Sequence, residues 1–288
     1  MVAQAADVRS RPANLPTLEG MPLHKARPPL GQHFLRDTSV CARIADAIVS
    51  PPEAHVIEIG PGRGALTGRL AAKGVPLTVV EVDEALADGL RDRYEGHGQA
   101  RVEVICADIL DIDLPDLIAQ RTEGRAVIAG NLPYYITSPI LRKVFSAAAG
   151  IERAVFLIQK EAALRLAARK DSRDYGFLSV LCRLHAEPEL LFSVPPEAFQ
   201  PPPEVTSAVV RLRMRRDIHA PPGFIDFLQR CFTHPRKKLL NNLSGVYPRE
   251  TLRQQPETDL RAQQLDLEEL RTLWDTLEAD PPSRIARP

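Results

Sequence analysis

Short apolar runs alternate with helical patterns through the first half of the chain. In the helical stretches, apolar residues recur every three or four positions, which is typical of a helix that packs one face against a core. Strands separated by such helices imply right-handed crossovers and a mostly parallel sheet, so an α/β fold is expected. The predicted strands are 56–59, 77–82, 102–106, 126–129 and 154–158, and the predicted helices are 39–49, 65–73, 84–94 and 139–149.

The pattern changes near Arg216, after which only helical periodicity is present, at 224–232, 237–244 and 265–277. A small, all-helical second domain is therefore predicted for 216–288. At the other end, residues 1–29 contain five prolines and show no clear period, so we expect a flexible tail. The α/β domain is predicted to span 30–215.

Composition narrows the classes of protein to consider. Hydrophobic residues make up 44% of the 288 residues and charged residues 26%, as in ordinary globular proteins with a core. The formal net charge is zero and the pI is about 7.1, so nucleic acid would have to bind at local basic patches. The four cysteines form no C-x-x-C pair, which argues against zinc and a disulfide framework.

No apolar run approaches the roughly 20 residues of a membrane span, and no secretory signal is evident. A cytoplasmic protein that contacts no membrane is expected. Nothing in the pattern suggests more than a monomer.

A glycine-rich segment, Glu58-Ile-Gly-Pro-Gly-Arg-Gly-Ala65, follows the first predicted strand. Glycines there let the backbone turn sharply and let a ligand approach closely. Glu81 ends the second strand about 20 residues later, where an acid binds ribose hydroxyls. Read as G-x-G-x-x-A, the loop fits NAD; read as G-x-G-x-G after an acid, it resembles the first motif of class I methyltransferases, which use S-adenosylmethionine.

Asp108 follows the third predicted strand. In class I methyltransferases an acid at this place contacts the adenine amine of the cofactor, and the resemblance extends that role to Asp108. The alternative is a helix N-cap.

The segment Gly130-Asn-Leu-Pro-Tyr-Tyr135 follows the fourth predicted strand. Asn131 to Tyr134 resembles the Asn/Asp-x-Pro-Tyr/Phe motif of methyltransferases that modify exocyclic amines. Such an amine is a poor nucleophile because its lone pair is delocalised into the ring. Two acceptors aimed at its hydrogens, the Asn131 side-chain oxygen and the Leu132 carbonyl held outward by Pro133, would free that lone pair. Tyr134 could stack on the base. The alternative is a tight turn with surface tyrosines, and Tyr135 has no role beyond packing.

Taken in order, these motifs resemble the ribosomal RNA adenine dimethyltransferases, which dimethylate two neighbouring adenosines near the 3′ end of small-subunit rRNA. The resemblance covers roughly residues 25 to 245. It implies a class I, Rossmann-like methyltransferase domain with a small all-helical, RNA-binding domain, S-adenosylmethionine as methyl donor and no metal. It further includes Gly31 to Leu35, Glu81-Val82-Asp83, Gln159-Lys160-Glu161, Phe199 to Val205 and Arg236 to Leu243.

The resemblance implies roles for further residues. His33 and Leu35 would border the cofactor, together with Gly60, Gly62 and Asn131. The family often has Asn at the position of His33, so a side-chain contact there is in question. Phe199, in a proline-rich loop, would cover the other face of the target base; the alternative is a packed loop aromatic.

Basic clusters are the candidates for binding RNA. Arg211, Arg213 and Arg215 alternate with apolar residues, so on a strand they would share one face. Arg236, Lys237 and Lys238 form a second cluster, where the family often has Arg-Arg-Lys-Thr. Each cluster alone is typical of a solvated face, but together they could line the rim of a cleft and bind phosphates.

Function therefore has one leading interpretation and three alternatives. The first is N6,N6-dimethylation of two adjacent adenosines near the 3′ end of 16S rRNA, within a 30S particle during its assembly. The alternatives are methylation of large-subunit (23S) rRNA, a non-catalytic RNA-binding or transcription factor on the same fold, and an NAD-dependent dehydrogenase. The sequence offers no hydride-transfer constellation for the last.

Overall fold

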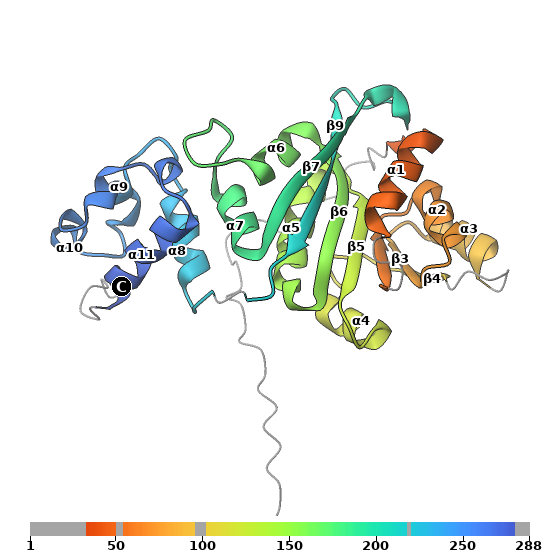
Figure 1. Ribbon diagram of the computed structural model, residues 1–288, viewed down its shortest axis with the longest axis horizontal. Coiled ribbons are helices and arrows are strands. Elements are labelled where there is room, and N and C mark those ends of the chain that lie inside the picture. The colour runs from red at the N-terminus through yellow and green to blue at the C-terminus, as the bar shows by residue number, and fades with distance from the viewer. Residues whose placement is uncertain (1–32, 50–53, 96–101, 218–219, 280–288) are drawn as a thin grey trace, which may run out of the picture. The chain divides into compact units, whose positions relative to one another are not determined.

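The computed structural model describes residues 33–49, 54–95, 102–217 and 220–279. The tail predicted at 1–29 lies outside these residues. A seven-stranded sheet in the order β4-β3-β2-β5-β6-β9-β7 forms the centre of the fold (Figure 1). Its strands are β2 (Val56–Ile59), β3 (Leu77–Glu81), β4 (Val102–Cys106), β5 (Ala126–Asn131), β6 (Ile151–Gln159), β7 (Ala186–Val194) and β9 (Ser207–Met214).

Strands β2 to β6 run parallel, and β9 lies antiparallel between β6 and β7. The chain builds outward from β2 to β4 and then returns to place β5 on the other side of β2. Strands β2 and β5 are therefore parallel neighbours, and the loops that follow them lie at the same edge of the sheet. In open α/β sheets the ligand crevice lies at this reversal of strand order.

Helices cover both faces of the sheet. One buried cluster joins the sheet to α4 (Leu114–Arg121), α5 (Thr137–Ser146), α6 (Lys160–Ala167) and α7 (Phe177–His185). The other joins it to α1 (Thr38–Ile48), α2 (Ala65–Ala72) and α3 (Glu84–Tyr94). Alternate strand residues enter opposite clusters, as Val127 and Ile128 do, because successive side chains of a strand point to opposite faces.

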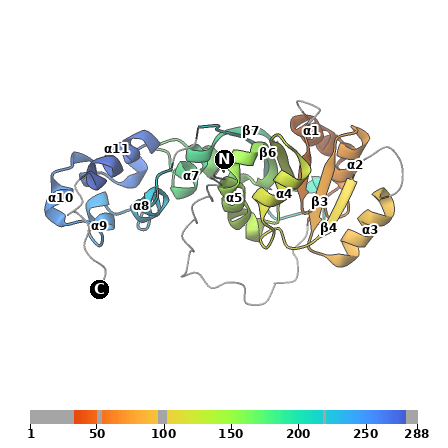
Figure 2. The same cartoon turned by 90° about the horizontal axis from the view of Figure 1, so that it is seen from below.

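A third cluster is built from the helices after residue 220 and from α7. These helices are α8 (Phe224–Cys231), α9 (Leu239–Leu243), α10 (Arg249–Arg253) and α11 (Leu267–Glu278). Phe224, Phe227 and Trp274 supply its aromatic centre. Figures 1 and 2 show this helical part, in blue, next to α7. The domain boundary near 216 stays a prediction.

A two-stranded sheet stands apart from the main one. Strand β1 (Phe34–Leu35) pairs antiparallel with β8 (Phe199–Gln200), so that Leu35 lies opposite Phe199. It joins two predicted site segments that are separated by more than half of the chain.

The predicted α/β fold is confirmed, with the first three strands ending within one residue of their predicted limits. All four cysteines are free thiols; Cys41, Cys182 and Cys231 are buried, and Cys106 is exposed. In the part of the chain that the structure describes, no helix is both long and apolar enough to cross a membrane.

Candidate active site

The loops after β2 and β5 come into direct contact at the carboxyl edge of the sheet. Glu58 of β2 lies opposite Ala129 of β5, so the two strands end at nearly the same height and their loops start side by side. A side chain at Gly130 would place its Cβ 2.5 Å from the Ile59 carbonyl oxygen, so only glycine fits this crossing. The glycine loop and the Asn131 motif, which are far apart in sequence, thus form one site.

The glycine loop turns through left-handed backbone conformations. Gly62 has φ +55°, and a Cβ there would lie 3.0 Å from the ring of Phe34, next to the residues expected to border the cofactor. The amide of Gly60 donates to the Val80 carbonyl at 2.9 Å, which ties the loop to the neighbouring strand. The result is a cradle of bare backbone that a ligand can approach closely.

Glu81 ends β3 beside this cradle and is 3% exposed. Its Oε2 accepts a hydrogen bond from the Gly62 amide at 3.0 Å, and its Oε1 accepts from the amides of Val82 and Asp83. A carboxylate can accept about four hydrogen bonds, so capacity remains on Oε2, the oxygen that faces the loop. A ribose hydroxyl is a suitable donor.

Asp108 lies just beyond β4, the strand next to β3. Its Oδ1 accepts from the Leu110 amide at 2.9 Å, so the side chain shapes a turn. The N-cap of the following helix is Asp113, not Asp108, which removes the helix-capping alternative. Asp108 and Glu81 therefore end adjacent strands at the same edge.

Glu58 is a buried acid directly beneath the glycine loop. It accepts a hydrogen bond from the Thr67 hydroxyl at 2.8 Å. Burial raises its pKa to about 7, with the nearby Glu81 charge adding to the rise. A protonated Glu58 carboxyl beneath the glycine loop avoids a second negative charge near Glu81 in a buried site.

A Glu58→Gln variant should lose pH dependence of folding stability that the wild type shows between pH 4.5 and 7. In that window Glu58 is protonated in the folded protein but ionised in the unfolded chain, so its contribution to the free energy of unfolding, which is the difference between the two profiles, falls as the pH rises. The rise of the Glu58 pKa from 4.5 to about 7 corresponds to a change of about 3 kcal/mol in the free energy of unfolding across this window. Denaturant unfolding of both proteins from pH 4 to pH 8 measures it. Glutamine can still accept from Thr67, and parallel pH profiles would contradict the prediction.

Asn131 is oriented by a residue nearly a hundred positions away. Its Nδ2 donates to the His33 carbonyl at 3.0 Å, which leaves Oδ1 as the free end of the amide. The Leu132 amide donates to the Leu157 carbonyl, and Pro133 follows with φ −58°. Within the described residues, neither Asn131 Oδ1 nor the Leu132 carbonyl accepts a hydrogen bond. Two unused acceptors therefore stand at consecutive residues.

Tyr134 is held on two sides. Its hydroxyl shares a 2.7 Å hydrogen bond with Ser207, and the ring of His33 stacks at 5.8 Å between centroids. Burial raises the pKa of the Tyr134 phenol, so the group stays neutral. A base can stack on this ring only at the face away from His33, or after displacing it. Tyr135, for which the sequence suggests packing, is 47% exposed.

Ser207 is the partner that sequence reasoning missed. It begins β9 and is fully buried. The only hint in the sequence is its place two residues after the Phe199 to Val205 motif. Its contact with Tyr134 spans 73 residues, and local patterns do not report such pairs.

Phe199 and Leu35 lie together but face the core. Phe199 is 1% exposed and shares a buried cluster with Leu35 and Ala198. In this conformation its ring is a packed loop aromatic, so covering a target base would require the β8 loop to move. His33 contacts the same loop, because its Nδ1 lies 2.9 Å from the Pro201 carbonyl.

The strand arginines do not reach these loops. Because β9 is antiparallel to β6, Ser207 is at the carboxyl edge while Arg213 lies opposite Arg153, near the start of β6. Arg213 thus lies toward the other end of the sheet, and Arg211, opposite Val155, lies at its middle. Both pair with Glu189 of β7, at 2.8 and 3.0 Å. Arg236, Lys237 and Lys238 are exposed in the helical part.

Comparison with known proteins agrees with this geometry. A family model described as "Ribosomal RNA adenine dimethylase" matches residues 23–272. A "Ribosomal RNA small subunit methyltransferase A" of Koribacter versatilis (strain Ellin345) is 40% identical over 96% of this chain and 99% of its own. One of the same name from Acidobacterium capsulatum is 42% identical over 88% and 92%.

Two solved structures share the fold over most of the chain. A dimethyladenosine transferase from Plasmodium falciparum has a TM-score of 0.74 at 23% identity, covering 88% of this chain and 100% of that one. The 23S rRNA methyltransferase ErmE has a TM-score of 0.61 at 29% identity, covering 85% and 99%.

The fold is that of a class I S-adenosylmethionine-dependent methyltransferase. The features that define it are the sheet order, the glycine loop, and the two acids Glu81 and Asp108 at the ends of adjacent strands. Its second loop narrows the class to enzymes that modify amines. The chain belongs to the ribosomal RNA adenine dimethylase family. This decides against an NAD-dependent dehydrogenase.

Proposed function

We propose that this protein transfers methyl groups to the N6 atoms of two adjacent adenosines near the 3′ end of 16S rRNA, within a 30S particle during assembly. One observation carries the proposal. Two oxygens beside the glycine loop, Asn131 Oδ1 and the Leu132 carbonyl, accept no hydrogen bond from any described residue. An exocyclic amine has two hydrogens to donate, and this pair matches them.

The residues at the carboxyl edge fit S-adenosylmethionine. Gly60 and Gly62 would let it lie against bare backbone, Glu81 would accept from its ribose, and Asp108 would contact its adenine amine. His33, Leu35 and Asn131 would border it where β1 meets the site. When bound, this group supplies a methyl carbon on a sulfonium, which leaves as the neutral thioether.

Asn131 and Leu132 would activate the nucleophile. Acceptors aimed at both amine hydrogens favour a tetrahedral nitrogen, whose lone pair then points at the methyl carbon. The amine nitrogen would accept the methyl group from the bound donor and would then lose one of its protons to water. Positioning and electrostatics carry this step, so no strong base is needed. To reach this loop, the target adenine must flip out of its stack, and it would then stack on the ring of Tyr134.

The RNA partner is supported by the relatives and by local charge. The two bacterial relatives above are named as small-subunit enzymes. Arg236 and Lys237 are exposed and could bind phosphates directly. Lys238 pairs with Asp259, and Arg211 and Arg213 share Glu189, so these three would have to exchange a carboxylate for RNA. A net charge of zero suits a protein that recognises an assembled particle, as a monomer in the cytoplasm.

A second candidate, methylation of large-subunit rRNA, is favoured by the likeness to ErmE. Incubation of each purified ribosomal subunit with methyl-labelled S-adenosylmethionine separates the two. We expect label on two adjacent adenosines of small-subunit particles that lack the modification. Label on 23S rRNA alone would support the second candidate, and no label on any adenosine would refute both.

A further inference from the structure

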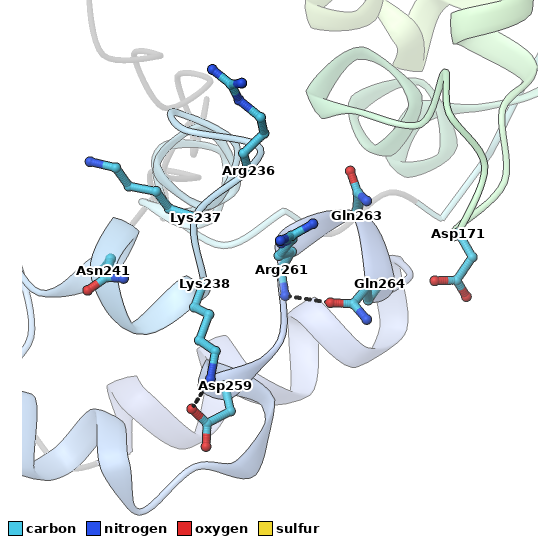
Figure 3. Close-up of a pocket in the computed structure, with 9 residues that line it drawn as sticks. All are labelled: Asp171, Arg236, Lys237, Lys238, Asn241, Asp259, Arg261, Gln263 and Gln264. Atoms are coloured by element: carbon cyan, nitrogen blue, oxygen red, sulfur yellow. Dashed lines mark hydrogen bonds and ion pairs between the residues drawn. The ribbon is translucent and has the colours of Figure 1, made fainter.

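A cavity of about 600 Å³ opens in the helical part of the protein and shares no residue with the methyl-transfer loops (Figure 3). Eight of its lining residues come from the segments around α9 and before α11, and Asp171 comes from the segment between α6 and α7. The lining residues are Asp171, Arg236, Lys237, Lys238, Asn241, Asp259, Arg261, Gln263 and Gln264.

The walls of the cavity are fixed by backbone contacts. Lys238 and Arg261 form a β-bridge, and the Leu239 amide donates to the Leu260 carbonyl at 2.8 Å. On the other side, the Asp171 amide donates to the Gln263 carbonyl at 3.0 Å. A ligand would therefore meet a preorganised site, which lowers the entropy lost on binding.

The lining contains four basic side chains, and three of them form no ion pair with a described residue. Lys238 pairs with Asp259 at 3.0 Å. By contrast, Arg236, Lys237 and Arg261 are exposed, and no carboxylate of the described ranges lies within ion-pair distance of them. Three unpaired cations around one cavity favour a ligand with phosphate charge.

Side-chain amides line the same cavity. Through their side chains, Asn241 and Gln263 form no hydrogen bond with another described residue. Gln264 Oε1 accepts from the Arg261 amide at 2.9 Å, which leaves its Nε2 as a donor. Amides carry both donors and acceptors, and this combination reads the edge of a nucleobase.

We propose that this cavity binds one unstacked nucleotide of an RNA strand, with its phosphates against Arg236, Lys237 and Arg261 and its base against the amides. The volume lies in the range of small-ligand pockets, and single-stranded RNA presents the unstacked bases that proteins read. The inference rests on the proposed function for its partner, ribosomal RNA. It adds a base-reading site separate from the one that holds the target adenine.

The test is binding of the full chain to a transcript of the 3′ part of small-subunit rRNA, without S-adenosylmethionine, at several salt concentrations. Arg261→Ala should reduce the slope of log affinity against log salt by about 1. Gln263→Ala removes an amide but no charge, so it should weaken binding about tenfold with the slope unchanged. Arg253→Ala, an exposed arginine of α10 outside the cavity, is the control and should change neither.

The proposal is overturned if Gln263→Ala binds like the wild type, or if Arg261→Ala and Arg253→Ala behave alike. Thermal unfolding of each variant verifies that it is folded. Because binding is measured without the methyl donor, the outcome is independent of catalysis. Loss of affinity in Gln263→Ala alongside absence of methyl transfer by the wild type would leave the nucleotide site intact and refute only the proposed function.

Discussion

Replacing Asn131 with alanine is expected to lower the rate of methyl transfer about 100- to 1000-fold, the effect of removing one preorganised polar partner from a transition state. The variant loses Oδ1, one of the two acceptors available to the amine. It also loses the hydrogen bond to the His33 carbonyl, but β1 stays paired with β8. Binding of S-adenosylmethionine and RNA should be largely kept, so single-turnover methyl transfer is the measurement.

Asn131→Asp is the matched comparison. It keeps an acceptor oxygen but replaces the Nδ2 donor, so it turns an attraction to the His33 carbonyl into a repulsion. Activity between that of the wild type and that of the alanine variant is expected. Unchanged turnover in Asn131→Ala would refute the assigned role.

Replacing Glu81 with alanine is expected to weaken binding of S-adenosylmethionine about 10- to 150-fold, the range for a hydrogen bond to a charged group. The change also leaves the Gly62, Val82 and Asp83 amides without their acceptor and loosens the glycine loop. Isothermal titration of the variant with S-adenosylmethionine measures the loss.

Glu84→Ala is the control, since Glu84 is an exposed acid in the first turn of α3, three residues further on. It should bind the methyl donor as the wild type does. Equal affinities for Glu81→Ala and the wild type would show that the ribose is held elsewhere.

The sheet could be predicted from sequence because parallel strands are buried on both faces and read as apolar runs. Strand β7 escaped prediction because it lies at the edge of the sheet, where its partly exposed residues and Pro188 hide the pattern. Helix α4 has only eight residues and starts with a proline at its first turn, so it looked like a connection.

The loops of the site were predictable because strand ends mark them, but their contacts were not. No local pattern reveals that Asn131 donates to His33 or that Tyr134 bonds to Ser207. The expected cleft role of Arg211 and Arg213 depended on strand direction. An alternating pattern shows which residues share a face, but not which end of the sheet they approach.

The pairing of β1 with β8 has a consequence during synthesis. The side-chain amide of Asn131 is aligned by the His33 carbonyl, and the segment that carries His33 is fixed only when Phe34 and Leu35 meet Gln200 and Phe199. A nascent chain that has folded strands β2 to β6 therefore still lacks an aligned Asn131 side chain. Contacts between distant segments form late, because loop closure costs entropy before they form. Competence for methyl transfer should thus emerge only after residue 200 has left the translating ribosome.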